Sequence, residues 1–583
     1  MNFYEVLIET LKTIPEFVSE DNSLLKNQII ESAMRLDDSL IESLFNNELI
    51  RERLFKKIGD NYIFDKVEFS WLINNREFLP DSYTKFKNII GLNWDNKYLI
   101  NNNDVVLAFP FKDCVLEGGQ SFEDQKRDEV FYNEIISKDQ ITNLLSPKVI
   151  TNVVKYSKDG KTKDFEIKHD DNFLIKGNNL LVISSLLKNY EGQVDLIYID
   201  PPFNTGKDSF KYNDRFTRST WLTYMKNRLE VSKKLLSDHG SIFIHIDENQ
   251  SHYLKVLCDE VFGEENFMNE IVWRYRTYIG NVKEYFPKKH DLIFWYKKKE
   301  KPFFKLSNVG NYEDTPDYAR WKNYLNENGE IVYGNHPKTD SRFEAYLRKY
   351  FSQFGTPKEG DVIYQNKGYV VDDVWEDIIA LDAKNGTERI TEFSGSGQKP
   401  EALLERIIDS VTKEGDLVLD FFSGSGTTCA VAHKMNRRYI GVEQMNYVES
   451  ITSKRLQNVI SGEQGGISEH VNWQGGGSFV YCELLENSSK YIEKINKAND
   501  TEKLIKIWEE LVKSPFVNFR IDIQQFKNNL DEFKNLDIEV QKEILLSIID
   551  KNQMYINYCD IEDADYSVSD EDKKRNAEFY EGE

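Results

Sequence analysis

The chain has 583 residues and a formal net charge of −23 at pH 7. This length predicts about three or four folding units. The sequence has no apolar run near the roughly 18 residues of a membrane span and no signal-peptide pattern, so we exclude membrane and export functions and expect a cytoplasmic location. The five cysteines show no Cys-x-x-Cys spacing, so neither a disulfide framework nor a metal site is expected.

The first part of the chain carries no catalytic pattern. Residues 1–105 contain amphipathic stretches, which predict an accessory domain of helical or mixed structure. Residues 106–169 are predicted to be a wrapping or linker segment with polar turns. The catalytic half is predicted to begin at residue 170. An amphipathic helix follows Gly177-Asn178-Asn179, where the amide of Asn178 is suited to cap the helix.

An apolar run at 194–199 predicts a buried strand that ends in Asp-Pro-Pro-Phe. The exocyclic amines of adenine and cytosine are poor nucleophiles because their lone pairs are delocalised into the ring. Asp200 can accept one N–H of such an amine and the Pro201 carbonyl the other, and Pro201 and Pro202 hold that carbonyl in place by fixing φ. Phe203 offers a face for base stacking, worth about 1–3 kcal/mol. The alternative is a strand end with Phe203 in the core.

Helix and strand patterns alternate after this loop. This alternation predicts a parallel sheet with helical crossovers over the catalytic half, residues 170–299. We expect His290, beside Asp291, to be structural and to have no role in proton transfer. The expected elements are a helix over 222–236, a strand over 241–246, a helix over 252–262 and a strand over 269–273.

A basic stretch stands out in this acidic chain. Residues 271–305 hold ten lysines and arginines against three acids, with aromatic residues between them. Such a stretch favours contact with nucleic-acid phosphates, because bound cations release counterions. The alternative is an ordinary solvated face. The candidate DNA contacts are Arg274, Arg276, Lys288, Lys289, Lys297 and Lys298.

Residues 300–385 break the alternation and show no clear periodicity. Further on, 393–397 reads Phe-Ser-Gly-Ser-Gly but lacks a preceding apolar strand, so it is interpreted as a flexible lead-in. A helix is predicted to begin near Pro400, since proline is preset for the first helical turn. Its apolar residues at helical spacing run from Leu403 to Val411.

A second apolar run, 417–419, ends in Asp-Phe-Phe-Ser-Gly-Ser-Gly and predicts a nucleotide-type site at the end of a parallel strand. Cys429 stands where a dinucleotide fold has its third glycine, and no phosphate loop is found. The next predicted strand ends in Glu443, whose carboxylate suits two ribose hydroxyls. S-adenosylmethionine, with a ribose and no phosphate, fits this pattern. The candidate residues are Asp420, Phe422, Ser423, Gly424, Gly426, Thr427 and Glu443.

The last part, residues 485–583, is predicted to be a helical domain with an acidic tail. Apolar residues within 504–512 and 544–549 have helical spacing, and these faces pack either on the core or on another subunit. Residues 560–583 hold ten acids against three bases, a ratio typical of a solvated tail.

The motifs resemble the β group of DNA amino-methyltransferases, in which an Asp-Pro-Pro-aromatic motif precedes a Phe-x-Gly-x-Gly motif. Members usually carry Tyr where Phe203 stands. Asp200 favours adenine N6, because cytosine-N4 enzymes of this group more often begin the motif with Ser. This order of the two motifs implies an α/β, Rossmann-like core in which the motifs are circularly permuted. The resemblance also implies that the enzyme depends on S-adenosylmethionine.

Longer strings are similar to the modification (Mod) subunit of type III restriction–modification systems over about residues 105–485. They are FKDCVLEGGQ at 111–120, DQKR at 124–127, DPPFNTG at 200–206, GGGSF at 475–479 and YCEL at 481–484. The resemblance implies a target-recognition domain at 300–385 and a cofactor-binding half at 386–484. It also implies that Lys399 and Pro400 approach the methionine end of the cofactor, and that Asn178 faces the ligand.

The reaction implied is site-specific methylation of adenine N6 in a base flipped out of duplex DNA. A homodimer and a separate restriction subunit are expected partners, since the chain has no helicase phosphate loop and no nuclease carboxylate cluster. Three alternatives remain: methylation of cytosine N4, a non-catalytic specificity subunit, and an RNA target.

Overall fold

The computed structural model divides the chain into two compact units, Met1–Asp104 and Val105–Glu583. The division lies beside the predicted boundary at residue 105. The described residues are 3–18, 24–58, 61–66, 69, 72–73, 93–94, 97–98, 107, 109, 112, 142, 144–206, 213–275, 284, 286–381, 387–391, 397–485, 489–512, 529–550, 555–563, 566 and 568–582.

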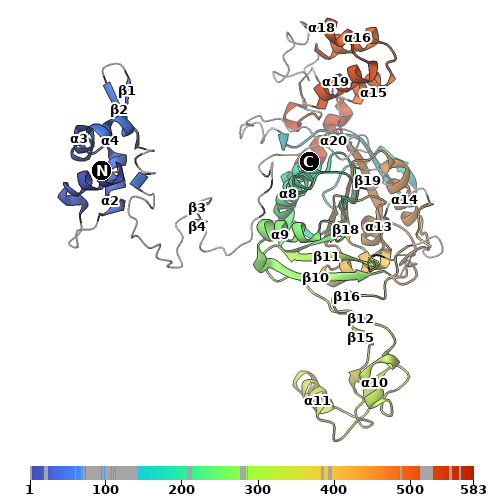
Figure 1. The fold of residues 1–583 in the computed structure, drawn as a ribbon. Helices are drawn as coiled ribbons and strands as arrows, with labels where there is room; N and C mark the ends of the chain where they lie inside the picture. Colours follow the sequence, from blue (N-terminus) through green and yellow to red (C-terminus); the bar gives the residue numbers. More distant parts are fainter. Residues whose placement is uncertain are drawn as a thin grey trace. The chain divides into compact units, whose positions relative to one another are not determined.

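The first unit packs helices around an apolar core that includes the fully buried Leu7, Leu40 and Leu54 (Figure 1). The side chains of Asp37 and Asn47 accept backbone N–H groups at the starts of α3 and α4, as helix caps do. Its elements are α1 (Phe3–Lys12), η1 (Pro15–Phe17), α2 (Lys26–Arg35), α3 (Asp38–Asn46), α4 (Glu48–Leu54), and the antiparallel pairs β1 (Phe55–Ile58) with β2 (Asn61–Phe64) and β3 (Asn93–Trp94) with β4 (Lys97–Tyr98).

The second unit is built on an eleven-stranded sheet of order β16-β10-β11-β9-β8-β17-β18-β7-β19-β5-β6. Strands from β9 through β19 in this order run parallel, which confirms the predicted α/β class. The strands are β5 (Ile150–Ser157), β6 (Gly160–Thr162), β7 (Phe173–Lys176), β8 (Val194–Ile199), β9 (Leu236–Ile246), β10 (Phe267–Arg274), β11 (His290–Lys297), β16 (Val374–Trp375), β17 (Leu417–Asp420), β18 (Arg438–Glu443) and β19 (Ser478–Leu484).

Helices cover both faces of this sheet (Figure 1). One face packs its apolar side chains against α7, α8 and α9, and the other against α12, α13 and α14. Parallel strands buried on both faces explain the continuous apolar runs in the sequence. The helices are α7 (Asn179–Tyr190), α8 (Arg218–Leu235), α9 (Ser251–Phe262), η3 (Glu264–Asn266), α12 (Glu401–Val411), α13 (Thr427–Lys434), η6 (Val448–Ser453) and α14 (Lys454–Ile460).

The sheet begins earlier than the predicted boundary at residue 170. Strands β5 and β6 lie in the segment 106–169 that was predicted to be a wrapping or linker segment. β5 pairs antiparallel with β19, with Tyr156 opposite Phe479. The polar residues of β5 concealed a strand in which Ile150, Val153 and Val154 are buried. Most of residues 106–143 lie outside the described part of the chain.

The described part of the segment 300–385 contains a small lobe whose core includes Trp321, Ile331, Phe343 and Ile363. Its amphipathic helix α11 was missed because no periodicity was recognised there. The lobe contains β12 (Asn308–Val309), η4 (Tyr312–Asp314), α10 (Pro316–Trp321), β13 (Glu330–Val332), α11 (Ser341–Phe354), β14 (Val362–Gln365) and β15 (Tyr369–Val370). The segment then returns to the main sheet through β16, beside β10.

The C-terminal region contains the predicted helices, and it also corrects one prediction. Residues 560–583 do not form a solvated tail: Phe579 and Tyr580 are buried in the core of the sheet, and Asn576 exchanges hydrogen bonds with the backbone of Ile150 at 2.8 and 2.7 Å. Three of the acids, Asp570, Glu571 and Asp572, lie in the first turn of α20, where the helix dipole favours negative charge. The elements are α15 (Ser489–Lys497), α16 (Thr501–Val512), α18 (Leu530–Lys534), α19 (Ile538–Asp550), η7 (Tyr558–Asp560) and α20 (Asp570–Glu581).

Candidate active site

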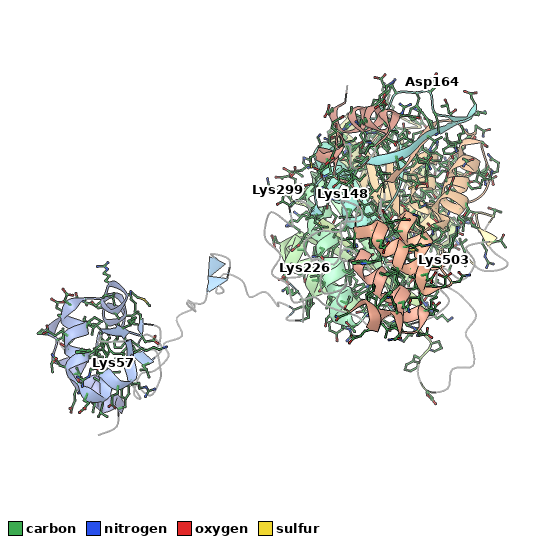
Figure 2. All side chains as sticks on the ribbon, turned by 90° about the horizontal axis from the view of Figure 1, so that it is seen from above. Lys57, Lys148, Asp164, Lys226, Lys299 and Lys503 are labelled. Atoms are coloured by element: carbon green, nitrogen blue, oxygen red, sulfur yellow. The ribbon has the colours of Figure 1, made fainter. Side chains whose placement is uncertain are left out.

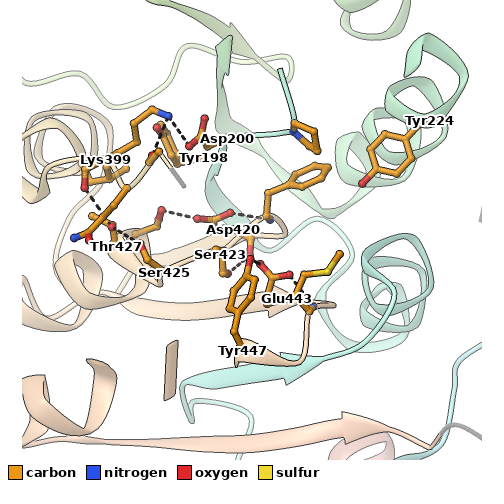
Figure 3. A pocket seen from close by; sticks show the side chains of 18 residues that line it. Tyr198, Asp200, Tyr224, Lys399, Asp420, Ser423, Ser425, Thr427, Glu443 and Tyr447 are labelled. Carbon is orange, nitrogen blue, oxygen red and sulfur yellow. Dashed lines mark hydrogen bonds and ion pairs between the residues drawn. The ribbon is translucent and has the colours of Figure 1, made fainter. Parts of the chain in front are cut away.

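The two predicted loops meet at one edge of the sheet. β8 and β17 are neighbours, with Val418 opposite Leu196 and Leu419 opposite Ile197, so the loop after β8 and the turn after β17 emerge side by side. A cavity lies between them (Figure 3). It is lined by Tyr198, Asp200, Pro202, Tyr224, Gly397, Gln398, Lys399, Leu404, Asp420, Phe422, Ser423, Gly424, Ser425, Thr427, Thr428, Glu443, Met445 and Tyr447.

Asp200 lines this cavity, and its two carboxylate oxygens differ in their hydrogen bonding. Its Oδ2 accepts a hydrogen bond from the Lys399 ammonium at 2.7 Å (Figure 3). Its Oδ1 is buried, and among the described residues no donor lies within hydrogen-bond distance of it. Leaving a buried carboxylate oxygen unpaired is costly. The arrangement therefore offers one acceptor to a ligand N–H.

The rest of the catalytic motif is held by its neighbours. The indole N–H of Trp221, on α8, donates to the Pro202 carbonyl at 2.8 Å. The Phe203 ring is half-buried and stacks on His245 with centroids 5.8 Å apart and an interplanar angle of 21°. The Lys399 ammonium lies 4.8 Å from the Phe203 centroid. Phe203 is thus packed beside Asp200, with His245 on one face.

The glycine-rich turn after β17 packs closely against its neighbours. Gly426 has φ +79°, and a Cβ there would lie 2.8 Å from Cγ2 of Thr452. The Gly424 N–H donates to Glu443 Oε2 at 2.8 Å, and its carbonyl accepts from Thr452 Oγ1 at 2.6 Å. Two neighbouring elements, β18 and η6, therefore fix the turn.

Glu443 lines the cavity but already accepts four hydrogen bonds. Oε2 accepts from Gly424 N and from the Tyr447 hydroxyl at 3.1 Å, and Oε1 from the N–H groups of Gln444 and Met445 at 2.8 and 2.9 Å. Burial raises the pKa of this carboxyl above its usual value. The predicted contact with ribose hydroxyls stays a prediction, because the carboxylate also serves to order the turn.

Asp420, at the end of β17, is 3% exposed. Its Oδ1 accepts from Phe422 N at 2.9 Å, and its Oδ2 from the Thr428 hydroxyl at 2.5 Å. Burial, with smaller contributions from the negative charges of Asp200 and Glu443, raises the pKa of Asp420 to about 7. This carboxyl is therefore poised to change its charge near neutral pH.

A buried ionic cluster, which the sequence did not reveal, joins the start of α12 to the turn. Glu401 is fully buried and accepts from Arg455 Nη2 and from Lys434 Nζ, each at 2.8 Å. Arg455 Nη1 donates to Thr427 Oγ1 at 2.8 Å, and this hydroxyl donates to the Lys399 carbonyl at 3.3 Å. The segment containing Lys399 and Pro400 is thereby fixed against the turn.

Asn178 takes the capping role that the sequence left open. Its Oδ1 accepts from the N–H groups of Leu180 and Leu181 at 3.0 and 3.4 Å. It is 3% exposed and is not among the described residues that line the cavity. Its neighbour Asn179 reaches the site indirectly, by donating to the Phe421 carbonyl at 3.0 Å.

The candidate DNA contacts do not form one patch. Arg274, in β10, is opposite His290 in the sheet register, at the end of β11 that lies on the cavity edge. Lys288 and Lys289 directly precede this end of β11. In contrast, Lys297 is opposite Ser241, at the far edge of the sheet, and Lys298 follows it and binds the Leu236 carbonyl at 2.5 Å.

Several of these cations already have partners. Arg274 forms an ion pair with Glu376 at 2.5 Å, and Lys288 with Glu248. Lys299, next to Lys298, lies on the outside of its unit (Figure 2). Arg276 is outside the described residues. The position of Lys297 and Lys298 argues against their assignment to the DNA surface at the site.

Over the described residues, no helix is long and apolar enough to cross a membrane. In the same part of the chain, no three His, Cys, Asp or Glu side chains are grouped so that they could hold a metal ion.

An Asp-Pro-Pro strand beside a glycine-rich turn, in an open α/β sheet, defines a methyltransferase acting on amino groups of DNA bases. Comparison with known families agrees: residues 194–454 match a DNA methylase family (N6_N4_Mtase), and residues 37–92 match the methylation subunit of type III restriction/modification enzymes. The second match lies in the N-terminal unit, where the motifs read from the sequence gave no resemblance.

The chain is also similar to individual proteins. The chain is 32% identical to the probable type III HindVI Mod subunit of Haemophilus influenzae over 97% of this chain and 96% of that one. It is 27% identical to the EcoP15I Mod subunit of Escherichia coli, over 47% of this chain and 57% of that one. A structure of M1.HpyAVI with S-adenosylmethionine covers 49% of this chain and 98% of that one, at 19% identity and a TM-score of 0.29. The chain belongs to the modification subunits of type III restriction–modification systems.

Proposed function

We propose that this chain transfers a methyl group from S-adenosylmethionine to N6 of an adenine flipped out of duplex DNA. The observation that carries the proposal is the buried Oδ1 of Asp200, an acceptor without a donor among the described residues, at the cavity beside the glycine-rich turn. Membership of the modification subunits supports DNA as the substrate.

The residues around the cavity fit S-adenosylmethionine. Three carboxyl groups, Asp200, Asp420 and Glu443, line it with one lysine, Lys399, among the described residues, which disfavours a polyphosphate. Because Asp200 is paired with Lys399, Asp420 and Glu443 are the carboxyl groups suited to a ligand with a positive sulfonium. Apolar groups of Phe422 and Met445 provide surfaces for an adenine ring. The cofactor would be held by the residues of the turn that line the cavity, which are Ser423, Gly424, Ser425 and Thr427.

S-adenosylmethionine, when bound, supplies a methyl group on a positively charged sulfur. Asp200 Oδ1 accepts one N–H of the target amine, and the Pro201 carbonyl accepts the other, which raises electron density on N6. The N6–methyl bond would form as the sulfur–methyl bond breaks, and N6 would then lose one proton, which Asp200 could accept at Oδ1. Alignment of the reactants supplies much of the rate, since effective molarities reach about 10⁵ M and above.

The proposal extends to the DNA and to other subunits. Arg274, Lys288 and Lys289 lie at the cavity edge of the sheet and are suited to contact phosphates beside the flipped base. The lobe at 300–385 is proposed to read the target sequence. We further propose that the chain forms a homodimer, that it acts with a separate restriction subunit that cleaves DNA, and that it is located in the cytoplasm.

Sequencing that detects methylated bases tests this function in cells. We expect DNA from cells that express the chain to carry N6-methyladenine at one short sequence, and DNA from cells that express Asp200→Ala to lack it. The same data give the strand and the recognition sequence. N4-methylcytosine at that sequence would overturn the choice of base.

Replacing Gly426 tests the glycine-rich turn. Gly426→Ala puts a Cβ in contact with Thr452 and forces a left-handed φ on an L-residue, which costs about 1–3 kcal/mol. We expect affinity for S-adenosylmethionine, measured by calorimetry, to fall about tenfold. Gly415→Ala is the matched control, because Gly415 has φ +85° with nothing within 4 Å of its Cβ position. Equal losses of affinity in the two variants would contradict a specific role for the turn.

The raised pKa of Asp420 predicts a pH dependence. Since the carboxyl is neutral below about pH 7 and ionised above it, we expect affinity for the cationic cofactor to rise about tenfold between pH 6 and pH 8. Asp420→Asn should remove this dependence. The stability of the unliganded fold should change in the opposite direction, so that it falls as the pH rises. The raised pKa of Asp420 contributes its full stabilisation below pH 3.8, the pKa of the unfolded state, and this stabilisation is lost as the pH rises through about 7. Affinity that falls over this range would contradict the role of the ionised carboxylate.

A further inference from the structure

A chain of buried polar groups lies beside the catalytic motif and takes no part in the mechanism above. The Tyr198 hydroxyl lies 3.0 Å from His245 Nδ1, and His245 Nε2 lies 3.0 Å from Asp291 Oδ2. The Tyr275 hydroxyl donates to the other oxygen of Asp291 at 3.4 Å. His245 is completely buried, and Tyr198 and Asp291 are nearly so.

The strand register places this chain under the Asp200 loop. Tyr198 lies in β8, two residues before Asp200, which directly follows the strand. Because side chains alternate along a strand, Tyr198 and Asp200 lie on the same face of the sheet. His245, in β9, is opposite Ile293 in β11, and Asp291 lies two residues before Ile293, again on that face. All of these residues are at the strand ends that form the cavity edge.

The hydrogen bonds determine the protonation of the imidazole. Asp291 can only accept while it is ionised, so Nε2 carries the proton and Nδ1 accepts from the Tyr198 hydroxyl. Burial and the positive charge of Lys399 lower the pKa of His245, which keeps the ring neutral. Burial is the largest single influence and acts to raise the pKa of Asp291, but the hydrogen bonds from His245 and Tyr275, together with nearby positive charge, outweigh it, and the pKa is lowered. The remaining charged group facing this ring is Asp200.

The ring of His245 has no freedom to turn. Both of its nitrogens are bound, and the edge of Trp273 packs against it at 5.6 Å and 86°. Its face carries the Phe203 ring. Phe203 in turn adjoins Lys399, whose ammonium holds Asp200. A rotation of the imidazole would break two buried hydrogen bonds and remove the support of Phe203.

From this arrangement we infer that His245 is a positioning residue for methyl transfer: fixed between Tyr198 and Asp291, its ring holds Phe203, and thereby Asp200, in the geometry that the target amine needs. The inference rests on the proposed function of the Asp200 site. An apolar residue at 245 would fill the same space, but it would leave the Tyr198 hydroxyl and the Asp291 carboxylate without their partner. His245 itself does not touch the cavity; it acts through Phe203.

The chain offers a matched control at the opposite edge of the sheet. His433 Nδ1 lies 3.2 Å from the Tyr439 hydroxyl, and both residues are buried. Tyr439 is near the start of β18, whereas the active site lies at the ends of the strands. Tyr439→Phe therefore removes the same kind of hydrogen bond as Tyr198→Phe, but far from the catalytic loop.

The test compares His245→Phe, Tyr198→Phe and Tyr439→Phe in the full chain. His245→Phe keeps an aromatic ring under Phe203 and loses both hydrogen bonds; Tyr198→Phe loses a single hydroxyl. We expect the single-turnover rate of methyl transfer to duplex DNA, at saturating S-adenosylmethionine, to fall about tenfold to a hundredfold in the first two variants. Cofactor affinity should stay within about twofold of wild type in His245→Phe, because His245 is not among the described residues that line the cavity. Tyr439→Phe should keep the wild-type rate.

A purely structural role would give a different result. The inference is overturned if His245→Phe and Tyr198→Phe lower only the melting temperature, while their folded fraction transfers methyl groups at the rate of Tyr439→Phe. If His245→Phe does not fold, Tyr198→Phe alone decides. Failure of the proposed function is distinguishable, because it would show as a wild-type protein that methylates a different atom or none.

Discussion

Asp200→Ala should lower the single-turnover rate of methyl transfer by about 10²–10³-fold or more, the range seen when one group that stabilises a transition state is removed. The variant loses the only side-chain acceptor assigned to the target amine and leaves the Lys399 ammonium without its carboxylate. Cofactor affinity should stay close to that of wild type, because the turn at 423–427 is held by β18 and η6. The rate is measured by rapid quench with labelled S-adenosylmethionine.

A carboxylate in β8, the strand that leads to Asp200, serves as the control. Asp195, in β8, accepts from Leu417 N at 3.0 Å at the end away from the cavity. Asp195→Ala should therefore reduce stability without changing the rate of the folded protein. An Asp200→Ala protein that keeps most of its activity would disprove the assigned role.

Glu401→Gln is expected to have the largest effect on stability, about 3–5 kcal/mol of unfolding free energy. Its carboxylate is fully buried between Lys434 and Arg455, and the substitution leaves the Arg455 guanidinium in the interior without a carboxylate. Lys434 keeps a second partner, Glu463, at 2.5 Å, which places the estimate near the lower end of the range. Urea unfolding followed by circular dichroism measures the change.

The matching control is an exposed ion pair. Glu510 pairs with Lys494, and each side chain is about half exposed. Glu510→Ala should change stability by about 0–1 kcal/mol, since solvent screens surface pairs. Because Arg455 also holds Thr427, Glu401→Gln should in addition weaken cofactor binding. A loss below that of Glu510→Ala would contradict the structural importance of the buried cluster.

The meeting of the two loops was predictable because it depends on local rules. Apolar runs identified β8 and β17 as buried strands, and parallel strands end at one edge. The glycines of the turn were recognised from their positions after a strand, and the similar string at 393–397 was set aside because no strand precedes it. The type III family resemblance, drawn from short motifs, is confirmed by the full-length relative from Haemophilus influenzae.

Contacts between distant side chains could not be predicted. The pairing of Lys399 with Asp200 spans 199 positions, and that of His245 with Asp291 depends on the register of β9 and β11. Composition also misled in α20, because the count of acids hid two buried aromatic residues in its last turns. Composition also could not show that the lysines of the basic stretch lie at both ends of β11, with Lys288 and Lys289 at the cavity edge and Lys297 and Lys298 at the far edge.

Mass spectrometry of nucleosides tests the central claim most directly. Duplex DNA is incubated with wild-type protein, or with Asp200→Ala, and S-adenosylmethionine carrying a deuterated methyl group, and is then digested. The account predicts deuterated N6-methyladenine from wild type and none from the variant, with both proteins binding the cofactor equally well. Deuterated N4-methylcytosine as the product, or N6-methyladenine formed equally by both proteins, would contradict it.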